Sequence, residues 1–409
     1  MFDFIKKQSP VRVIALGFAL VILLGSVLLI MPFSVQEGAV VHYIDTLYTS
    51  TSAVCVTGLI AIDAGDNFTF IGQFILAALI QIGGLGVTSV GAGIILVMGR
   101  KINLKERSVL QEALNLDSAQ GILRFLKRIF LMTLCFEGVG AALSFIVFVQ
   151  DYPPLRALWI SIFHSVAAFN NSGFDILGNY QNLIPYRDNV MLNLITCGLI
   201  IFGGIGFLVI QDVLHNHFHW KKFSMHTKVV ITVSAILIVV GAVLLKLTEN
   251  ITWLAAFFHS VSARTAGFST YPLAEFNSAG LLVLIVLMFI KSAATNRGEK
   301  AFHYAVPSGA FRKAAVITLL ALSVVLTGTW LMMVFEPQLR LVDALFEMTS
   351  AFGTVGLSTG ITTGLGIPAK LISILTMYIG RLGPLTIASV WYFDKGERIS
   401  YPEGNIAIG

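Results

Sequence analysis

Long apolar runs alternate with shorter, half-polar segments along this chain. Seven runs are long enough to cross a bilayer, which takes about 20 residues of helix. They lie near Val11–Met31, Phe68–Met98, Ile129–Val149, Val190–Ile210, Val229–Leu247, Ala314–Val334 and Leu371–Phe393. An eighth run, Leu281–Ile290, is too short. The pattern predicts a polytopic, all-α membrane protein.

Four half-apolar segments lie between these runs, and each ends at a loop that contains glycine. The segments are Tyr43–Val54, Leu155–Phe169, Ile251–Ser262 and Leu341–Phe352. They are too short to cross the membrane, so we interpret them as re-entrant helices. The loops share Ala and polar residues before a glycine, and they end at Gly58, Gly173, Gly267 and Gly356. The sequence therefore predicts four similar pore loops that surround one axis.

Composition and charge agree with a membrane protein. The chain has 56% hydrophobic and 12% charged residues, with a mean hydropathy of +0.83. This balance excludes an ordinary soluble domain. Lys and Arg gather in alternate loops, which predicts that those loops and both termini are cytoplasmic. The clusters are Lys6, Lys7 and Arg12; Arg100, Lys101, Lys105, Arg107, Arg124, Lys127 and Arg128; Lys221, Lys222 and Lys228; Lys291, Arg297, Lys300, Arg312 and Lys313; and Lys395 and Arg398.

The net charge of +5 therefore reflects topology, and we expect no nucleic-acid partner. Acidic residues in the opposite loops predict a mildly acidic outer mouth. Cys55, Cys135 and Cys197 lie in apolar surroundings and give no disulfide framework. The polar start, Met1–Pro10, and the long first apolar run indicate an uncleaved anchor. A multi-pass protein of a prokaryotic inner membrane is the simplest interpretation.

A second motif repeats in the helices that follow three of the loops. It reads Ile82–Gly86, Phe202–Gly206 and Ile379–Gly383, with two or three glycines each. Small residues let membrane helices pack closely, which is one explanation for the glycines. It does not explain Arg381, because a charge within a membrane is tolerated mainly beside a polar cavity. We expect Arg381 to face a shared, water-filled vestibule.

The chemistry of the loops favours cation coordination. Non-helical backbone at membrane depth occurs only where it is buried in protein or lines water. Glycine permits backbone dihedrals that turn successive carbonyls toward an axis, where they replace the hydration shell of a cation. The re-entrant helices would point their negative C-terminal ends at the same place. The alternative, that the glycines only cap short helices, does not explain why all four precede a long inner helix.

These motifs resemble the Trk/Ktr/HKT potassium transporter superfamily, and most closely the KtrB membrane subunits of its Ktr branch. The resemblance covers essentially the whole chain. It rests on Val56–Leu59, Phe169–Phe174, Ala263–Phe268, Phe352–Leu357 and Ile379–Thr386, and the tail Tyr401–Gly404 is also similar. The resemblance implies four pseudo-repeats of outer helix, re-entrant pore helix, filter loop and inner helix around one pore, as in a single-chain potassium channel.

The resemblance also implies a function. It implies potassium uptake promoted by sodium, a homodimer, and control by a cytosolic octameric ring of nucleotide-binding KtrA subunits. It implies no covalent cofactor and no enzyme activity. The filter residues carried over are Val56, Thr57, Gly58, Asn171, Ser172, Gly173, Thr265, Ala266, Gly267, Thr354, Val355 and Gly356. Arg381 matches the arginine beneath the filter, whose charge would hinder ion passage.

We expect the repeats to span residues 1–100, 101–216, 217–300 and 301–393, followed by a cytoplasmic tail at 394–409. The third repeat departs from the family, in which a Gly/Ser/Thr-rich gate interrupts the third inner helix. Here Ile290 is followed directly by Lys291 and a polar segment. Either the gate is deleted, or a stretch is missing between these two residues. We favour the second interpretation.

Other features are weaker. His215, His217, His219 and His226 crowd one loop, and we favour a position at lipid headgroups over zinc binding. Thr49, His164, His259 and Glu347 occupy one position of the four pore helices, where we expect hydrogen-bonded packing. The segment Leu104–Lys127 is basic and amphipathic and is expected at the inner membrane surface or a cytosolic partner. A secondary symporter with a midplane substrate site is the main alternative, and no catalytic set supports an intramembrane enzyme.

Overall fold

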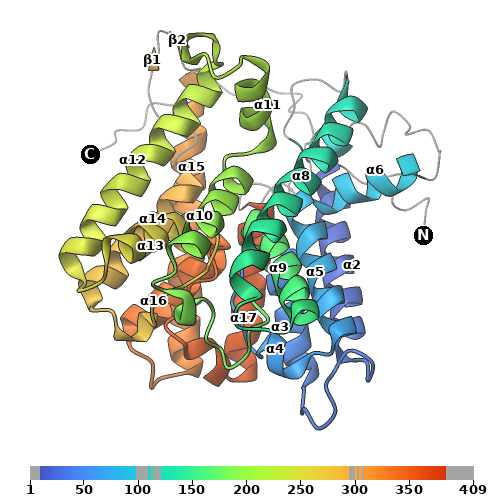
Figure 1. Ribbon diagram of the computed structural model, residues 1–409. Coiled ribbons are helices and arrows are strands. Elements are labelled where there is room, and N and C mark those ends of the chain that lie inside the picture. The colour runs from blue at the N-terminus through green and yellow to red at the C-terminus, as the bar shows by residue number, and fades with distance from the viewer. Residues whose placement is uncertain are drawn as a thin grey trace, which may run out of the picture.

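The computed structural model describes residues 10–97, 109–111, 114, 121–293, 300–301, 304–305 and 308–383. The predicted tail at 394–409 and most of the amphipathic segment at 104–127 lie outside this part of the chain. Helices dominate the described residues (Figure 1). A two-residue antiparallel pair, β1 (Lys300–Ala301) and β2 (Tyr304–Ala305), is the exception.

Four long helices meet the length and hydropathy needed to cross a membrane. They are α2 (Pro10–Ile30), α8 (Ile122–Phe148), α12 (Met225–Thr248) and α15 (Ser308–Phe335). Each is followed by a short helix, and these are α3 (Tyr43–Val54), α9 (Pro154–Phe169), α13 (Trp253–Thr265) and α16 (Leu341–Gly353). The short helices match the four segments that the sequence predicts as re-entrant.

Each short helix leads through a loop to an inner helix. The inner helices are α5 (Phe70–Leu85), α10 (Val190–Gly204), α14 (Ser278–Ala293) and α17 (Ile367–Leu382). The connecting segments hold α4 (Ala64–Asn67), η1 (Ile184–Tyr186), η3 (Leu273–Glu275) and η4 (Ile361–Gly364), and η2 (Trp220–Lys222) follows α11 (Phe207–His215). The element order of outer, short and inner helix therefore occurs four times.

Two of the expected crossings are not continuous helices. α5 meets α6 (Val87–Val97) at an angle of 101°, and α10 meets α11 (Phe207–His215) at 96°. Figure 1 shows α6 and α11 turned away at the end of the molecule opposite α4. The bends lie at Gly86 (φ 86°, ψ 132°) and Gly206 (φ 89°, ψ 145°), backbone conformations that favour glycine. Gly383, which ends α17, has nearly the same dihedrals, φ 86° and ψ 138°.

A mode of packing that repeats in the first three units holds outer, short and inner helices together. At Gly25, Gly140 and Gly241 of the outer helices, a side chain would collide with a serine of the short helix and a leucine of the inner helix. The three sets are Gly25, Ser50 and Leu79; Gly140, Ser165 and Leu199; and Gly241, Ser260 and Leu287. The serine hydroxyls donate to outer-helix carbonyls at 2.7–2.8 Å, so each close approach also satisfies a buried polar group.

The four units follow one another in a closed circle. Each inner helix contacts the short helix of the next unit, in the pairs α5 with α9, α10 with α13, α14 with α16, and α17 with α3. The last pair joins segments more than 300 residues apart in the sequence. The short helices and their loops therefore lie inside the assembly, with the outer helices around them.

The third unit differs in its inner helix. Leu79, Leu199 and Thr376 are the inner-helix residues that lie against a glycine of the outer helix in the first, second and fourth units. In each case a glycine follows four residues later, at Gly83, Gly203 and Gly380. In α14 that register position is Lys291, and the helix ends at Ala293. The change from apolar to polar residues after Ile290 therefore occurs at the position where each of the other inner helices has the glycine that lies against its short helix.

Candidate functional site

The four loop glycines form a closed ring with the loop of the neighbouring unit. A Cβ on Gly58 would collide with the carbonyl of Ser172, and one on Gly173 with that of Ala266. Likewise Gly267 abuts the carbonyl of Val355. The circle closes because Gly356 abuts the carbonyl of Thr57. Four glycines and four carbonyl oxygens thus alternate around one centre.

The backbone at these glycines has the conformation that only glycine adopts without strain. Their φ angles are 94°, 71°, 78° and 95° in chain order. In the first, second and fourth loops the residue two positions earlier is also left-handed, with φ of 56° at Val56, 58° at Asn171 and 48° at Thr354. The third loop is one residue shorter and lacks this feature. The special feature of the ring is therefore its backbone conformation and not its side chains.

Local hydrogen bonds hold the loops. The amides of Thr57, Ser172 and Val355 each donate to a carbonyl of the preceding short helix, at 2.7–2.9 Å. Ser52 and Ser350 accept from the amides of Gly58 and Gly356, both at 3.0 Å. The first and fourth loops therefore have the same bonding pattern. The Thr57 hydroxyl is fully buried without a partner among the described residues.

The ring separates two cavities. The outer one, about 360 Å³, is lined by Gly58, Gly267 and Gly356. The inner one, about 190 Å³, is lined by the loop residues Val56, Asn171, Thr265 and Thr354. The residues between them, Thr57, Ser172, Ala266 and Val355, are fully buried. The structure thus brings together all twelve residues that the sequence assigns to the loops.

The lining of the outer cavity is uncharged, and the acidic outer-loop residues from which the sequence predicts a mildly acidic mouth do not line it. Its lining residues are polar or apolar and none is charged. The nearby acids are engaged in bonds to backbone amides instead: Asp63 accepts from Tyr180 at 2.7 Å and Asp66 from Asn179 at 2.7 Å. Burial raises the pKa of Asp63, and it raises the pKa of Asp175 to about 7. The bonds of Asp63 and Asp66 join outer loops of the first and second units, whereas Asp175 accepts from Leu177 and Asn182 within the second unit.

Arg381 lines the inner cavity, as the sequence predicts for a polar vestibule. Its guanidinium donates to the carbonyl of Gly83 in the first unit. Gly83, Gly203 and Gly380 abut the carbonyls of Val54, Phe169 and Phe352, at the C-terminal ends of three short helices. The repeated glycine motif therefore serves close packing. Arg381 adds a positive charge to the motif on the side that faces the inner cavity.

The shared polar position of the short helices is used for packing, as expected. His164 Nε2 lies 2.9 Å from Thr196 Oγ1, and His259 Nε2 lies 3.1 Å from Ser269 Oγ. Glu347 accepts from the hydroxyls of Ser358, at 2.8 Å, and Thr362. The fourth member, Thr49, is buried with no partner for its hydroxyl among the described residues. Hydrogen-bonded packing is confirmed for three of the four.

Two polar groups around the second loop are not apparent from the sequence motifs. Asn170 Nδ2 donates to Gln81 Oε1 at 2.8 Å and to Glu137 Oε1 at 3.0 Å, which links the loop to α5 and α8. Asn182 reaches both the second and the third loop. A glutamate inside an apolar helix is a signal that could have found the first group, because such charges are rare in membranes.

Among the described residues no three His, Cys, Asp or Glu side chains form a metal site, so the structure offers no support for zinc at the histidine loop.

Comparison with known proteins agrees with this architecture. The sequence matches the family described as TrkH, cation transport protein, over residues 23–306 and 310–393. It is 34% identical to the potassium/sodium uptake protein NtpJ of Enterococcus hirae, over 99% of this chain and 98% of that protein. It is also 34% identical to the Ktr system potassium uptake protein B of Bacillus subtilis, over 98% of this chain and 97% of that protein.

The fold has a counterpart among solved structures. It is similar to the crystal structure of the potassium transporter TrkH from Vibrio parahaemolyticus, with a TM-score of 0.71 and 17% sequence identity. The match covers 94% of this chain and 86% of that one. The alignment with NtpJ extends over 445 residues, 36 more than the 409 of this chain. Relatives are therefore longer internally, and a missing segment after Ile290 stays a prediction.

Proposed function

The chain belongs to the TrkH family of cation transport proteins, and on that premise we propose that it takes up potassium across the cytoplasmic membrane through a channel-like pore. The selectivity filter would consist of the four loops that end at Gly58, Gly173, Gly267 and Gly356. Potassium is the substrate here, and no covalent cofactor is needed. The printed names of the relatives, which describe potassium uptake proteins, support this choice of ion.

One observation carries the proposal. Four left-handed glycines and four carbonyl oxygens alternate in a closed ring between an outer and an inner cavity. A ring of backbone carbonyls replaces the hydration shell of a monovalent cation. Because the ring itself consists of glycines and backbone carbonyls, the backbone would contact the ion. This arrangement suits a permeant cation better than a bound organic substrate.

The short helices favour a cation at the ring, whereas Arg381 opposes its passage on the inner side. The short helices end next to the loops, so the negative ends of their dipoles face the ring. Arg381 lies beneath, in the inner cavity. A positive charge there would raise the energy of a cation leaving the filter, and the proposal assigns Arg381 the role of an electrostatic barrier. Flux would depend on how far this side chain moves or is neutralised.

Regulation and assembly follow the Ktr relatives in this proposal. Two of the similar proteins are named as the B and D proteins of Ktr potassium uptake systems. We expect a homodimer, a cytosolic nucleotide-binding ring as regulator, and promotion of uptake by sodium. The protein would be a multi-pass protein of the inner membrane with both termini in the cytoplasm.

A secondary symporter with a substrate site at the midplane is the competing function. Broken helices occur in such transporters, and α5/α6 and α10/α11 are broken here. However, those folds are usually built from two large repeats, whereas this chain repeats a small unit four times. The uncharged outer cavity also offers no group to bind a charged organic substrate.

Uptake in cells lacking their own potassium transporters tests the function. Expression of the full chain with a Ktr-type regulatory subunit should restore growth at low potassium and give saturable potassium uptake. Rubidium should compete, and sodium should compete poorly. Equal uptake of sodium and potassium, or strict coupling to an organic solute, would contradict the proposal. Protein abundance in the membrane fraction serves as the control for expression.

A further inference from the structure

We propose that Asn182 determines the coordination of the outermost ion site by holding the Gly173 carbonyl away from the ion. The outermost position would then offer three free glycine carbonyls instead of four. The inference rests on the proposed potassium filter and goes beyond it, since it assigns a specificity-determining role to a residue outside the loops. Asn182 is a positioning residue, because it acts through the carbonyl of Gly173.

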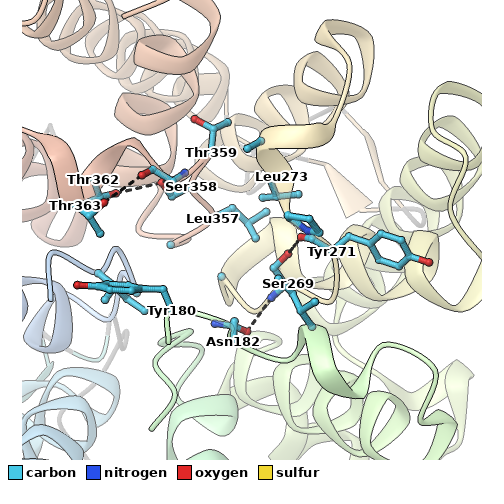
Figure 2. Close-up of a pocket in the computed structure, with 18 residues that line it drawn as sticks. Tyr180, Asn182, Ser269, Tyr271, Leu273, Leu357, Ser358, Thr359, Thr362 and Thr363 are labelled. Carbon is cyan, nitrogen blue, oxygen red and sulfur yellow. Dashed lines mark hydrogen bonds between the residues drawn. The ribbon is translucent and has the colours of Figure 1, made fainter. Parts of the chain in front are cut away.

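The side chain of Asn182 uses both ends of its amide. Nδ2 lies 3.2 Å from the Gly173 carbonyl oxygen and 3.2 Å from Asp175 Oδ2. Oδ1 accepts from the backbone amides of Leu183, at 2.9 Å, and Ser269, at 3.0 Å. Because two N–H donors face Oδ1, the amide orientation is fixed and Nδ2 must be the donor toward Gly173. Figure 2 shows the Asn182–Ser269 bond between the second and third units.

The lining of the outer cavity gives an independent observation. Gly58, Gly267 and Gly356 line this cavity, and Gly173 does not. In the described part of the chain no side chain donates to the carbonyl of any of those three glycines, whereas Gly173 has Asn182. A carbonyl that accepts a hydrogen bond directs a lone pair at the donor. The second loop is therefore the one whose glycine carbonyl is already engaged.

Asparagine suits position 182 for backbone and side-chain reasons together. Its φ is 49°, in the left-handed region that asparagine, aspartate and glycine tolerate best. Its short amide supplies a donor and an acceptor at the same reach, which aspartate and glycine do not. Aspartate would keep the backbone and the acceptor but, in its ionised form, lose the donor to Gly173. Glycine would keep the backbone and lose both.

Three carbonyls would bind a dehydrated potassium ion less tightly than four. Conduction requires sites that are strong enough to admit an ion and weak enough to release it. The arrangement would leave the ion partly hydrated at the outer end of the filter, so that entry costs less dehydration in one step. Loss of the Asn182 donor should release the Gly173 carbonyl, tighten the outermost site and lower the KM for external potassium.

Transport by two variants of Asn182 tests this. Asn182→Asp and Asn182→Gly should each lower the KM for potassium by about three- to tenfold, the net worth of one hydrogen-bond-like interaction. Both should also change the ratio of potassium to rubidium uptake. Asn179→Asp is the matched control. Asn179 is exposed and has a φ of 57°, and its replacement by aspartate adds the same charge without contacting Gly173. The glycine variant separates release of the carbonyl from added charge.

The outcomes distinguish this inference from the function on which it rests. Wild-type protein that shows no preference for potassium would overturn the proposed function. Wild-type uptake selective for potassium, with KM and ion ratio unchanged in both Asn182 variants, would overturn the inference alone, as would equal effects of Asn179→Asp. If the variants do not accumulate, a rubidium-soaked crystal structure of the wild type decides. The ion should lie at three glycine carbonyls, and rubidium bound to Gly173 would refute the role of Asn182.

Discussion

Lys370 Nζ lies 2.7 Å from Asp45 Oδ1 in a buried ion pair that joins the last inner helix to the first short helix. Tyr48 and Ser373 add a hydrogen bond of 2.9 Å between the same two helices. The pair therefore closes the circle of four units at the contact between the first and the fourth. Both side chains are only 10% exposed, so each charge depends on the other for compensation.

Breaking this pair on one side should destabilise the protein strongly. Asp45→Asn or Lys370→Met leaves one buried charge without its partner, which costs about 3–5 kcal/mol. The double variant Asp45→Leu with Lys370→Met should recover most of the loss, because a packed apolar pair avoids the desolvation penalty. Thermal unfolding in detergent measures both effects. Equal stability of single variants and wild type would show that the pair does not hold the circle closed.

Substitution of a loop glycine should abolish ion selectivity. Gly58→Ser and Gly356→Ser place a side chain against the neighbouring carbonyls of Ser172 and Thr57 at φ angles of 94° and 95°. The ring cannot keep its geometry, so we expect the preference for potassium over sodium to fall by about tenfold or more.

Gly38→Ser is the control for these substitutions. Gly38 has a φ of 87° but nothing near its Cβ position. It therefore reports the strain of a positive φ without the collision. Unchanged selectivity in both filter variants, measured by uptake of potassium and sodium, would remove the assignment of the loops as a filter.

Neutralising Arg381 should raise the flux of potassium. The side chain lines the inner cavity beneath the ring and is hydrogen-bonded to Gly83. Removal of its charge in Arg381→Ala lowers the electrostatic cost of a cation in that cavity. We expect uptake several times faster per molecule, while Arg381→Lys, which keeps the charge, stays near wild type. Slower or equal flux in well-expressed Arg381→Ala would count against a barrier.

Asp175 should make the stability of the outer loops depend on pH. Burial raises its pKa from 3.8 to about 7, so the folded protein binds this proton more tightly than the unfolded chain. The stabilising effect is complete below about pH 4 and is lost as the pH rises through 7. Wild-type protein should therefore lose more thermal stability between pH 6 and pH 8 than Asp175→Asn.

The measurement is the difference in Tm between the two proteins at each pH. Asp63, whose pKa burial also raises, acts in the same direction, so the variant should reduce the pH dependence without removing it. Identical pH profiles for wild type and Asp175→Asn would mean that Asp175 does not titrate in this range.

Local pattern alone was enough to locate the outer and short helices of this protein. Stretches of about 20 apolar residues identify membrane helices because the bilayer core fixes their length. The half-apolar segment Tyr43–Val54 coincides with α3. An apolar face followed by a glycine predicts a short helix from local sequence, whatever the helix packs against. The positions of Gly58 and Gly356 were predictable for the same reason: a positive φ is a property of a single residue.

Relationships between distant residues came only from the tertiary structure. The sequence predicted a continuous helix over Phe68–Met98, but the chain turns at Gly86, because an apolar run does not record its direction. The sequence also placed Asp63 in an outer loop without its partner, which is the backbone amide of Tyr180, 117 residues away. The ion pair of Lys370 with Asp45 depends on how the four units close into a circle, and the bond of Asn182 to the amide of Ser269 depends on how the second unit meets the third. Sequence fixes what each residue can bond with, and only packing decides which partner comes within reach.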